Sequence, residues 1–243
     1  FFVEQDKVNV EQSAYLIEQI PITFYIRQLF SNQTEIRTRG DGKSVVYNDN
    51  LSQLKMDRTT NIITFFENKP GDETLLYTNN LTQTFTQMKR LGGWQLGMSF
   101  SSVDLSSNIV EYVRYVSSYP ILSSGREGMT QVKATTNGIE KLRTSSLIAQ
   151  TPLPTKNKKV TIVGGKDIVA ELLNEGFSMN EIEDIRIGYS WTTSSENNQI
   201  VEFIPTWYIK INNKWKTLSE LKADKKAGDA ANKQTVGGDG DGL

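Results

Sequence analysis

The stretch EFIPTWYIKINNKW, residues 202–215, holds Trp207, Tyr208 and Trp215 within nine residues, arranged around two adjacent asparagines. The pattern indicates two strands joined by a tight turn, because Asn readily adopts the positive φ that such a turn requires. A two-residue turn at 212–213 would place Trp215 beside Lys210. A three-residue loop, 212–214, instead gives one face four apolar side chains, which are Trp207, Ile209, Ile211 and Trp215. Because a slip of one residue would send Trp215 to the other face, burial favours the three-residue loop.

The predicted hairpin, strands 199–211 and 215–218, has an outer face with a distinct composition. Lys210 and Lys216 point to solvent together, and Tyr208 is the aromatic side chain left beside them. A solvent-facing aromatic between lysines is common at protein interfaces. We therefore take Tyr208, Lys210 and Lys216 as the candidate partner surface, and we expect the apolar face to pack on a helix at 168–175.

The helix and strands around this hairpin have an earlier counterpart in the chain. KKVTIVGGKDIVAELLNEGF predicts a strand, a Gly-Gly turn, and a helix capped by Asp167 and ended by Gly176. Upstream, NNLTQTFTQMKRLGGW predicts a helix that Asn80 caps and Gly92 or Gly93 ends. A pair of strands follows each helix.

The second strand of each pair begins with similar residues, NIVEYV at 108–113 and QIVEFI at 199–204. Together with the matching order of elements, this indicates a duplicated α+β unit. We expect Glu111 and Glu202 to occupy equivalent strand positions.

The rest of the chain completes an α+β prediction. Residues 8–30 show helical spacing, and residues 42–69 read as a three-strand meander. We predict two related domains, 1–123 and 124–222, each an antiparallel sheet meander with one or two packed helices. Residues 223–243 are rich in Lys, Asp, Gly and Ala and are expected to form a disordered tail.

The composition restricts the possible chemistry. Lys plus Arg total 27 and Asp plus Glu total 28, so the net charge of −1 does not favour nucleic acid. The chain has no histidine and no cysteine, which excludes Ser-His-Asp and Cys-His catalysis and the common zinc sites. We expect no catalytic residue, cofactor or metal.

No apolar run is long enough to span a membrane. Because the chain opens at Phe1, we expect it to be an excised fragment.

Short motif matches have simpler explanations. Ser52 and Ser219 begin SxxK patterns, but the companion motifs of penicillin-binding enzymes are missing. The GGK turn at 164–166 lacks the phosphate-loop pattern. The GDGDG run at 238–242 lacks the order of ligands in a calcium loop. The acidic stretch at 181–184 follows Ser178, and Ser178 with Glu181 forms a capping box.

Four segments together resemble the YycH/YycI family, in particular the C-terminal extracytoplasmic part of its YycH members. They are IRIGYSW with FIPTWYIKINNKW near the end, and LFSNQTEIRTRGDGKSVVYNDNLSQLKMD with VEYVRYVSSYPILSS upstream. The resemblance covers about residues 20–221 in several segments, and YycI members share the final pattern. It implies two related α+β domains without catalytic residues, on the outer face of the cell membrane of a Gram-positive bacterium.

The same resemblance implies a role in regulating the cell-wall sensor kinase WalK together with a YycI-type partner. The full-length protein would be anchored through an N-terminal membrane helix that is absent here. Two other functions stay open at this point. A module that binds wall polymer or peptide would need Tyr208, Tyr189 or Trp191 to line an exposed groove. A carboxylate-only wall hydrolase would need two acids, such as Glu181, Glu183 or Asp184, facing each other across a cleft.

Overall fold

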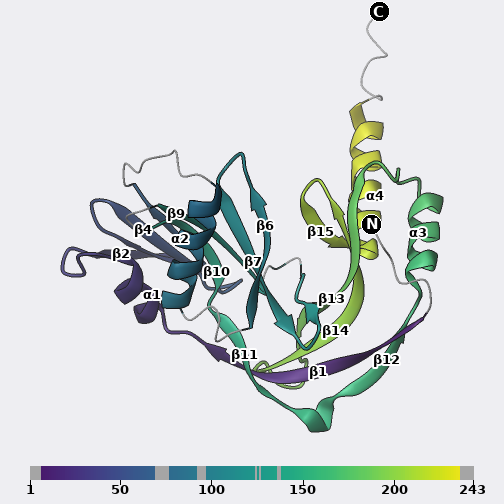
Figure 1. Ribbon diagram of the computed structural model, residues 1–243, viewed down its shortest axis with the longest axis horizontal. Coiled ribbons are helices and arrows are strands. Elements are labelled where there is room, and N and C mark those ends of the chain that lie inside the picture. The colour runs from purple at the N-terminus through teal and green to yellow at the C-terminus, as the bar shows by residue number, and fades with distance from the viewer. Residues whose placement is uncertain are drawn as a thin grey trace, which may run out of the picture. The chain divides into compact units, whose positions relative to one another are not determined.

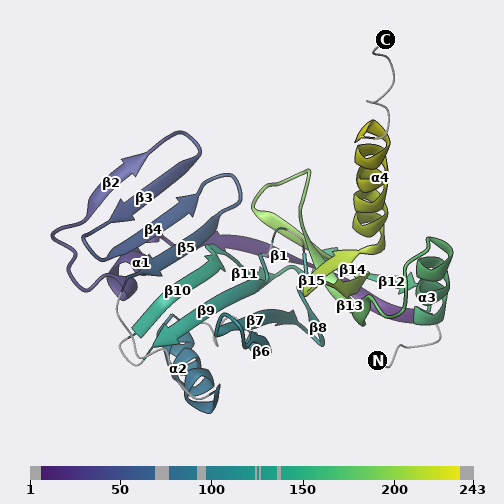
Figure 2. The same cartoon turned by 90° about the horizontal axis from the view of Figure 1, so that it is seen from above.

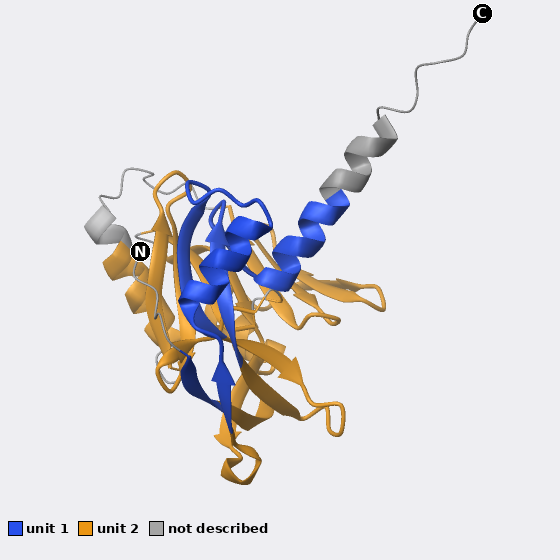
Figure 3. Ribbon diagram, turned by 90° about the vertical axis from the view of Figure 1, so that its right-hand side faces the viewer, with its two compact units in different colours: residues 1–11, 159–188, 205–243 blue, residues 12–158, 189–204 orange. Residues whose placement is uncertain are grey.

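The computed structural model describes residues 7–68, 77–91, 97–123, 125, 127–135 and 138–235, without the side chains of 77–80 and 228–235. The chain divides into two compact units built from non-consecutive segments (Figure 3). Unit 1 contains residues 1–11, 159–188 and 205–243, and unit 2 contains residues 12–158 and 189–204. These units differ from the consecutive domains 1–123 and 124–222, which stay a prediction. The α+β class with antiparallel sheets is confirmed.

Unit 2 is dominated by a nine-stranded antiparallel sheet (Figure 2). Its strand order is β2-β3-β4-β5-β10-β9-β7-β6, with β8 paired to β7. The bounds are β2 Arg37–Gly40, β3 Ser44–Asn48, β4 Ser52–Asp57, β5 Ile62–Glu67, β6 Met98–Asp104, β7 Ile109–Val116, β8 Tyr119–Pro120, β9 Met129–Thr135 and β10 Gly138–Ser145. The predicted meander is confirmed as β3 to β5, and β2 extends it by one strand that the sequence analysis missed.

Aspartates at the strand ends fix the tight turns of this sheet. Asp41, Asp49 and Asp57 each accept hydrogen bonds from two backbone N–H groups two and three residues later. Asp104 does the same for Ser106 N–H and also accepts from the Ser106 and Ser107 hydroxyls. These hydroxyl bonds lower the pKa of Asp104 to about 2. Such side-chain bonds stabilise the turn conformation, and with it the strand register.

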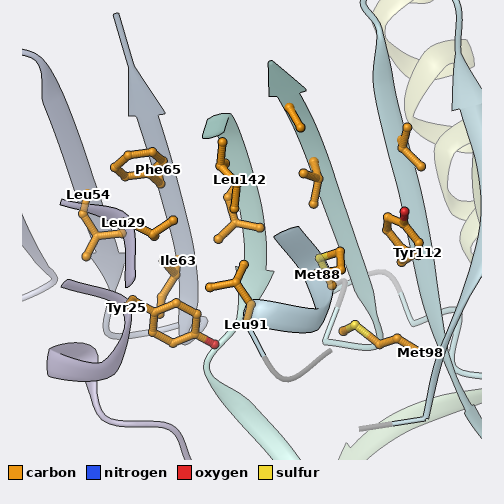
Figure 4. Close-up of a cluster of buried hydrophobic side chains, with 14 of the residues drawn as sticks. Tyr25, Leu29, Leu54, Ile63, Phe65, Met88, Leu91, Met98, Tyr112 and Leu142 are labelled. Carbon is orange, nitrogen blue, oxygen red and sulfur yellow. The ribbon is translucent and has the colours of Figure 1, made fainter. Parts of the chain in front are cut away.

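The main core of unit 2 lies on one face of this sheet, under two helices (Figure 4). The helices are α1, Ile22–Leu29, and α2, Tyr77–Arg90 (Figure 1). Tyr25 and Leu29 of α1 and Met88 of α2 pack on Ile63 and Leu142 of the sheet. Alternate residues of each strand therefore face this core, and the intervening residues face away from the helices.

The predicted start of the second helix is wrong, because α2 begins at Tyr77 and Asn80 lies inside its first turn. The sequence NNLT contains a good capping residue, but TLLYT continues the apolar spacing upstream of it. The expected end at Gly92 or Gly93 lies outside the described residues, and the helix stops at Arg90.

The predicted helical lead-in is also partly wrong. Residues Val8–Gln19 form strand β1, while the second half of the lead-in is helical as α1. The buried positions Val10 and Ala14 are four residues apart, a spacing that is in phase with a strand as well as with a helix. Pairing with β11, Leu147–Pro152, and β14, Ile200–Ile211, decides for the strand.

A six-stranded sheet has the order β11-β1-β14-β13, with β12 paired to β1 and β15 to β14. The remaining bounds are β12 Lys158–Ile162, β13 Ile182–Thr193 and β15 Lys214–Thr217. Strands β1, β13 and β14 contribute residues to both units. Unit 1 also holds helices α3, Gly165–Asn174, and α4, Leu218–Thr235.

The order of elements expected for a duplication is present, as α2-β6-β7 and as α3-β13-β14. Glu111 of β7 and Glu202 of β14 share a local environment. Each accepts a hydrogen bond from a glutamine amide, from Gln131 at 3.1 Å and from Gln12 at 3.0 Å. That the two copies superimpose stays a prediction.

Helix α3 ends at Gly176 as expected. Gly176 has φ +77° and donates its N–H to Leu173 O, while Phe177 N–H bonds to Leu172 O, which is the usual glycine-ended helix terminus. The expected cap at Asp167 is wrong. The helix begins at Gly165 after Gly164, and Asp167 lies in its first turn, where a negative charge still favours the helix.

We expect Gly176→Ala to lower the free energy of unfolding by about 1 kcal/mol, because an L side chain at this positive φ is strained. The chemical-denaturation midpoint of purified protein measures the effect. Gly42→Ala is the control, because its added Cβ meets no atom within 4 Å and its φ is outside the left-handed region. A Gly176→Ala midpoint equal to that of Gly42→Ala would contradict this assignment of strain.

The predicted disordered tail is wrong for residues 223–235, which continue helix α4, whereas 236–243 lie outside the described residues. The segment is rich in Ala and Lys, which are good helix formers. Its first turns are also held by charge: Lys222 bonds to Glu171 at 2.7 Å and to Glu175 at 2.9 Å. These carboxylates raise the pKa of Lys222. Long-range pairs of this kind were not visible in the local composition.

Candidate functional site

The β14–β15 hairpin has the register that the sequence analysis rejected. Lys210 pairs with Trp215 and Ile211 with Lys214, so the turn is the two residues Asn212 and Asn213, at φ 50° and 58°. Two positive φ values are the mark of a type I′ turn, whose twist matches that of the strands. Turn geometry therefore outweighed the burial of Trp215, which lies under the Arg186 guanidinium at 4.6 Å.

Tyr208 is not on the surface. It is 1% exposed, and its neighbours Trp207 and Ile209 are 5% and 0% exposed. Both faces of β14 are therefore covered at this point, and the alternation that assigned Tyr208 to solvent was misleading. Trp207 donates its indole N–H to Val163 O at 2.9 Å, which satisfies the polar atom of this buried ring.

Lys210 and Lys216 stay partly exposed but have carboxylate neighbours. Lys210 Nζ lies 3.5 Å from Glu183, and Lys216 forms an ion pair with Asp224 of α4. These pairs neutralise much of the positive charge that suggested an interface. Without an exposed Tyr208 the predicted surface loses its aromatic anchor, and a partner contact through Lys210 and Lys216 stays a prediction.

The aromatics of the alternative wall-binding groove are largely buried as well. Tyr189 is 1% exposed and packs on Phe203 at 5.9 Å between ring centroids, as Trp191 does at 5.5 Å. Phe203 is fully buried. With Tyr208 and Tyr189 in the interior, Trp191 alone of the three retains partial exposure. This arrangement does not support an aromatic platform.

The acids proposed for a hydrolase are engaged in local structure. Glu181 accepts the Ser178 N–H at 2.9 Å, which is one of the two bonds of the predicted capping box, whereas the Ser178 hydroxyl accepts from Asn180 N–H at 3.3 Å. Glu183 accepts the Asn213 N–H at 2.7 Å, and Asp184 pairs with Arg186.

The other sequence motifs show no catalytic arrangement either. Ser52 is buried at the start of β4 and lies 3.4 Å from Glu67, and Ser219 lies in the first turn of α4. The GDGDG run lies outside the described residues. Within the described part of the chain, no group of three acidic side chains is positioned to hold a metal ion.

The structure identifies a different candidate surface, on the face of the nine-stranded sheet that α1 and α2 leave uncovered in unit 2. Two rows of cross-strand neighbours run over this open face, which we define by them. The first row is Arg37, Asn48, Gln53, Phe66, Lys141 and Lys133, and the second is Arg39, Val46, Lys55, Thr64, Arg143, Gln131 and Glu111. Six of these side chains are cationic, and the two direct cross-strand neighbours of Phe66 are Gln53 and Lys141.

Phe66 is the apolar centre of the open face. It is 44% exposed, and Lys141 Nζ lies 5.8 Å from its ring centroid. A hollow of about 270 Å³ lies beside it, lined by Phe66, Ile109 and Leu142 and by the stems of Lys133, Lys141 and Arg143. Aromatic side chains and Arg are enriched at protein interfaces. The arrangement suits a protein partner that brings an apolar side chain and negative charge.

Two acidic residues reduce the positive charge of the open face. Glu140 pairs with Lys133 at 2.9 Å, and Glu111 accepts from Gln131. Lys141, Arg143, Lys55, Arg37 and Arg39 extend the positive area beyond them. The sequence IITFFE predicts a strand and does not by itself single out Phe66. Its two adjacent phenylalanines do indicate an exposed aromatic side chain, because successive residues of a strand face opposite sides and one of the two must face away from the core.

Comparisons with known proteins agree on one family. The family model described as "YycH protein, C-terminal domain" matches residues 1–225. The Bacillus subtilis two-component system WalR/WalK regulatory protein YycH is 19% identical over 223 residues, which are 88% of this chain and 49% of that protein. The crystal structure of YycH from Bacillus subtilis has a TM-score of 0.70 at 16% identity, over 89% of this chain and 53% of that one.

These comparisons show the family and the fold that this chain shares with YycH. The chain spans about half the length of the relatives it matches, and the structural likeness at this identity shows the fold. No helix in the described ranges combines the length and apolarity that crossing a bilayer requires.

Proposed function

The chain belongs to the family of YycH C-terminal domains, and from this membership we propose that it is a non-catalytic regulatory module of a WalR/WalK-type two-component system. The observation that carries the proposal is the match to a WalR/WalK regulatory protein along 88% of the chain. The absence of His and Cys from the sequence is compatible with a role exercised by binding alone.

The mechanism we propose is a shift in the populations of the kinase's signalling states. A bound protein changes such an equilibrium only by its different affinity for the two states. The full-length protein, anchored by an N-terminal membrane helix, acts on the outer face of the membrane with a YycI-type partner. In this scheme the present chain supplies the contact with that partner.

We propose that the YycI-type partner docks on the open face of unit 2. Phe66 is the exposed apolar anchor, and Lys141 and Arg143 face an acidic surface of the partner. Central aromatic anchors contribute most of the energy at such interfaces, while charges at the rim set orientation and association rate. Helices α1 and α2 pack on the opposite face of the sheet.

This docking leads to a matched pair of variants. We expect Phe66→Ala with Lys141→Glu to weaken binding of the purified chain to the partner's extracytoplasmic domain by about 30-fold or more, as loss of a hot spot does. Phe85→Ala with Lys89→Glu makes the same changes on α2. Phe85 is 42% exposed, and Lys89 Nζ lies 4.5 Å from its ring centroid. Calorimetric or interferometric titration gives both affinities.

The α2 double variant should bind like the unmodified chain, and binding of the unmodified chain should weaken as ionic strength rises. Equal losses in the two double variants would reject the open face as the docking site. Melting curves of both proteins verify that each is folded.

The regulatory role has its own test in the source bacterium. Deletion of the full-length gene should change transcription of WalR-controlled genes, and the gene with Phe66→Ala and Lys141→Glu should restore it less than the gene with the α2 double variant. Unchanged transcription on deletion would contradict the proposed function, whichever surface binds the partner.

A further inference from the structure

Arg114 of β7 is a buried cation, and two of its three side-chain nitrogens lack a protein acceptor. Its side chain points to the helix-covered face of the unit 2 sheet, and the residue is 3% exposed. Its Nε and Nη1 atoms have no hydrogen-bond partner among the described residues, and no described carboxylate forms an ion pair with it. Buried guanidinium N–H groups without acceptors are costly, so something else has to accept these bonds.

The surroundings of Arg114 are those of an anion site. A cavity beside the guanidinium is lined by four apolar side chains, Met88, Leu91, Met98 and Leu142 (labelled in Figure 4). The other lining residues carry hydroxyl groups and are Tyr25, Thr130, Thr144 and Ser145. Thr130 and Thr144 are 2.7 Å apart, and one of their hydroxyl protons is used in that bond, which leaves the other free to donate. The Tyr25 hydroxyl already donates to Ser145 O at 3.5 Å, so the donors in the lining are the Arg114 N–H groups and the Thr and Ser hydroxyls, together with one positive charge.

The charge persists at neutral pH. Burial lowers the pKa of Arg114 to about 10, which still leaves the guanidinium protonated at pH 7. Tyr25 is close enough to interact with it, but burial raises the pKa of the Tyr25 hydroxyl far above neutrality. The phenol therefore stays uncharged. A water molecule would satisfy donors in this cavity, whereas only an anion would also compensate the charge.

The size of the cavity limits the anion. About 10 Å³ is available to the centre of a water molecule, which is room for one particle of about that size. A chloride ion is only slightly larger than water, whereas a phosphate or sulfate is much larger. Apolar side chains form the rest of the lining and favour a weakly hydrated monovalent anion over a divalent one.

We propose that unit 2 contains a binding site for a single monovalent anion of chloride size, held by Nε and Nη1 of Arg114 and by the neighbouring hydroxyl groups. The site joins Tyr25 of α1, Met88 of α2 and Leu91, which follows α2, to β7. An ion bound there stabilises the packing of both helices on the sheet, and does so independently of partner binding at the open face.

The test compares thermal unfolding of the purified chain in sodium chloride, sodium bromide and sodium gluconate at equal ionic strength and pH 7. A ligand that binds only the folded state raises Tm with the logarithm of its concentration. At tenfold above the dissociation constant, we expect chloride and bromide to raise Tm by about 3–6 °C relative to gluconate. Crystals grown in bromide should show an anomalous peak within hydrogen-bond distance of Arg114 Nε or Nη1.

Arg114→Met keeps the length of the side chain and removes its charge, so its Tm should be the same in chloride and in gluconate. Arg143→Met is the control, because Arg143 lies on the open face of the same sheet, and it should keep the full halide response. Should Arg114→Met not fold, Thr130→Val with Thr144→Val removes the hydroxyl donors and should reduce the halide response. Equal Tm values of the unmodified chain in chloride and gluconate, or a density peak at Arg114 without bromide anomalous signal, would overturn the proposal.

Discussion

Trp207→Ala and Tyr208→Ala are each expected to destabilise unit 1 by about 3–5 kcal/mol, the usual cost of removing a buried large aromatic. The two side chains alternate along β14, yet they are 5% and 1% exposed. Trp207→Ala also leaves Val163 O without the indole N–H that it accepts at 2.9 Å. The alternation of the sequence alone would have assigned a negligible effect to Tyr208→Ala.

Urea denaturation followed by tryptophan fluorescence and circular dichroism measures both variants. Lys210→Ala is the control, because this partly exposed side chain forms an ion pair with Glu183 at 3.5 Å, and such pairs contribute less than about 1 kcal/mol. A Tyr208→Ala protein with the midpoint of Lys210→Ala would show that the outer side of β14 is open to solvent.

Phe203→Ala is expected to have an effect of similar size on unit 2. Phe203 is fully buried and is the centre of three ring contacts, with Tyr15 at 5.4 Å, Trp191 at 5.5 Å and Tyr189 at 5.9 Å. We expect a loss of about 3–5 kcal/mol from cavity formation, with lost edge-to-face contacts contributing within that range. Near-ultraviolet circular dichroism reports directly on the packing of these rings.

Phe100→Ala provides the comparison for Phe203→Ala. Phe100 is 47% exposed, and among the described residues its ring contact is with Tyr112, at 6.5 Å between centroids. Its removal should cost less than half as much as that of Phe203. A Phe203→Ala protein with an unchanged near-ultraviolet spectrum would mean that the aromatic cluster does not order this part of the sheet.

Sequence periodicity correctly predicted the elements whose spacing of apolar residues fits a strand or a helix but not both. The strands of the meander are an example, because Leu54 and Phe65 alternate with polar or exposed positions. Lead-in residues Val10 and Ala14 fit a helix and a strand equally, and only pairing with β11 and β14 distinguishes the two.

The errors about surfaces have a different cause. Alternation indicates which residues share a face of a strand, but it does not reveal whether the second face is covered. Tyr208 was therefore assigned to solvent, whereas Phe66, in a strand that the sequence analysis identified, was not recognised as exposed. The ion pairs that join Lys222 to Glu171 and Glu175 link residues about 50 positions apart, so local composition could not predict them.

Docking of the YycI-type partner on the open face is tested most directly by hydroxyl-radical footprinting of the chain with and without the partner's extracytoplasmic domain. Phe66 and Phe85 are almost equally exposed, at 44% and 42%, and so should be oxidised at similar rates in the free chain. If the partner docks on the open face, it should slow oxidation of Phe66 several-fold and leave oxidation of Phe85 unchanged. Oxidation of Phe66 at the same rate in the complex and in the free chain would contradict it.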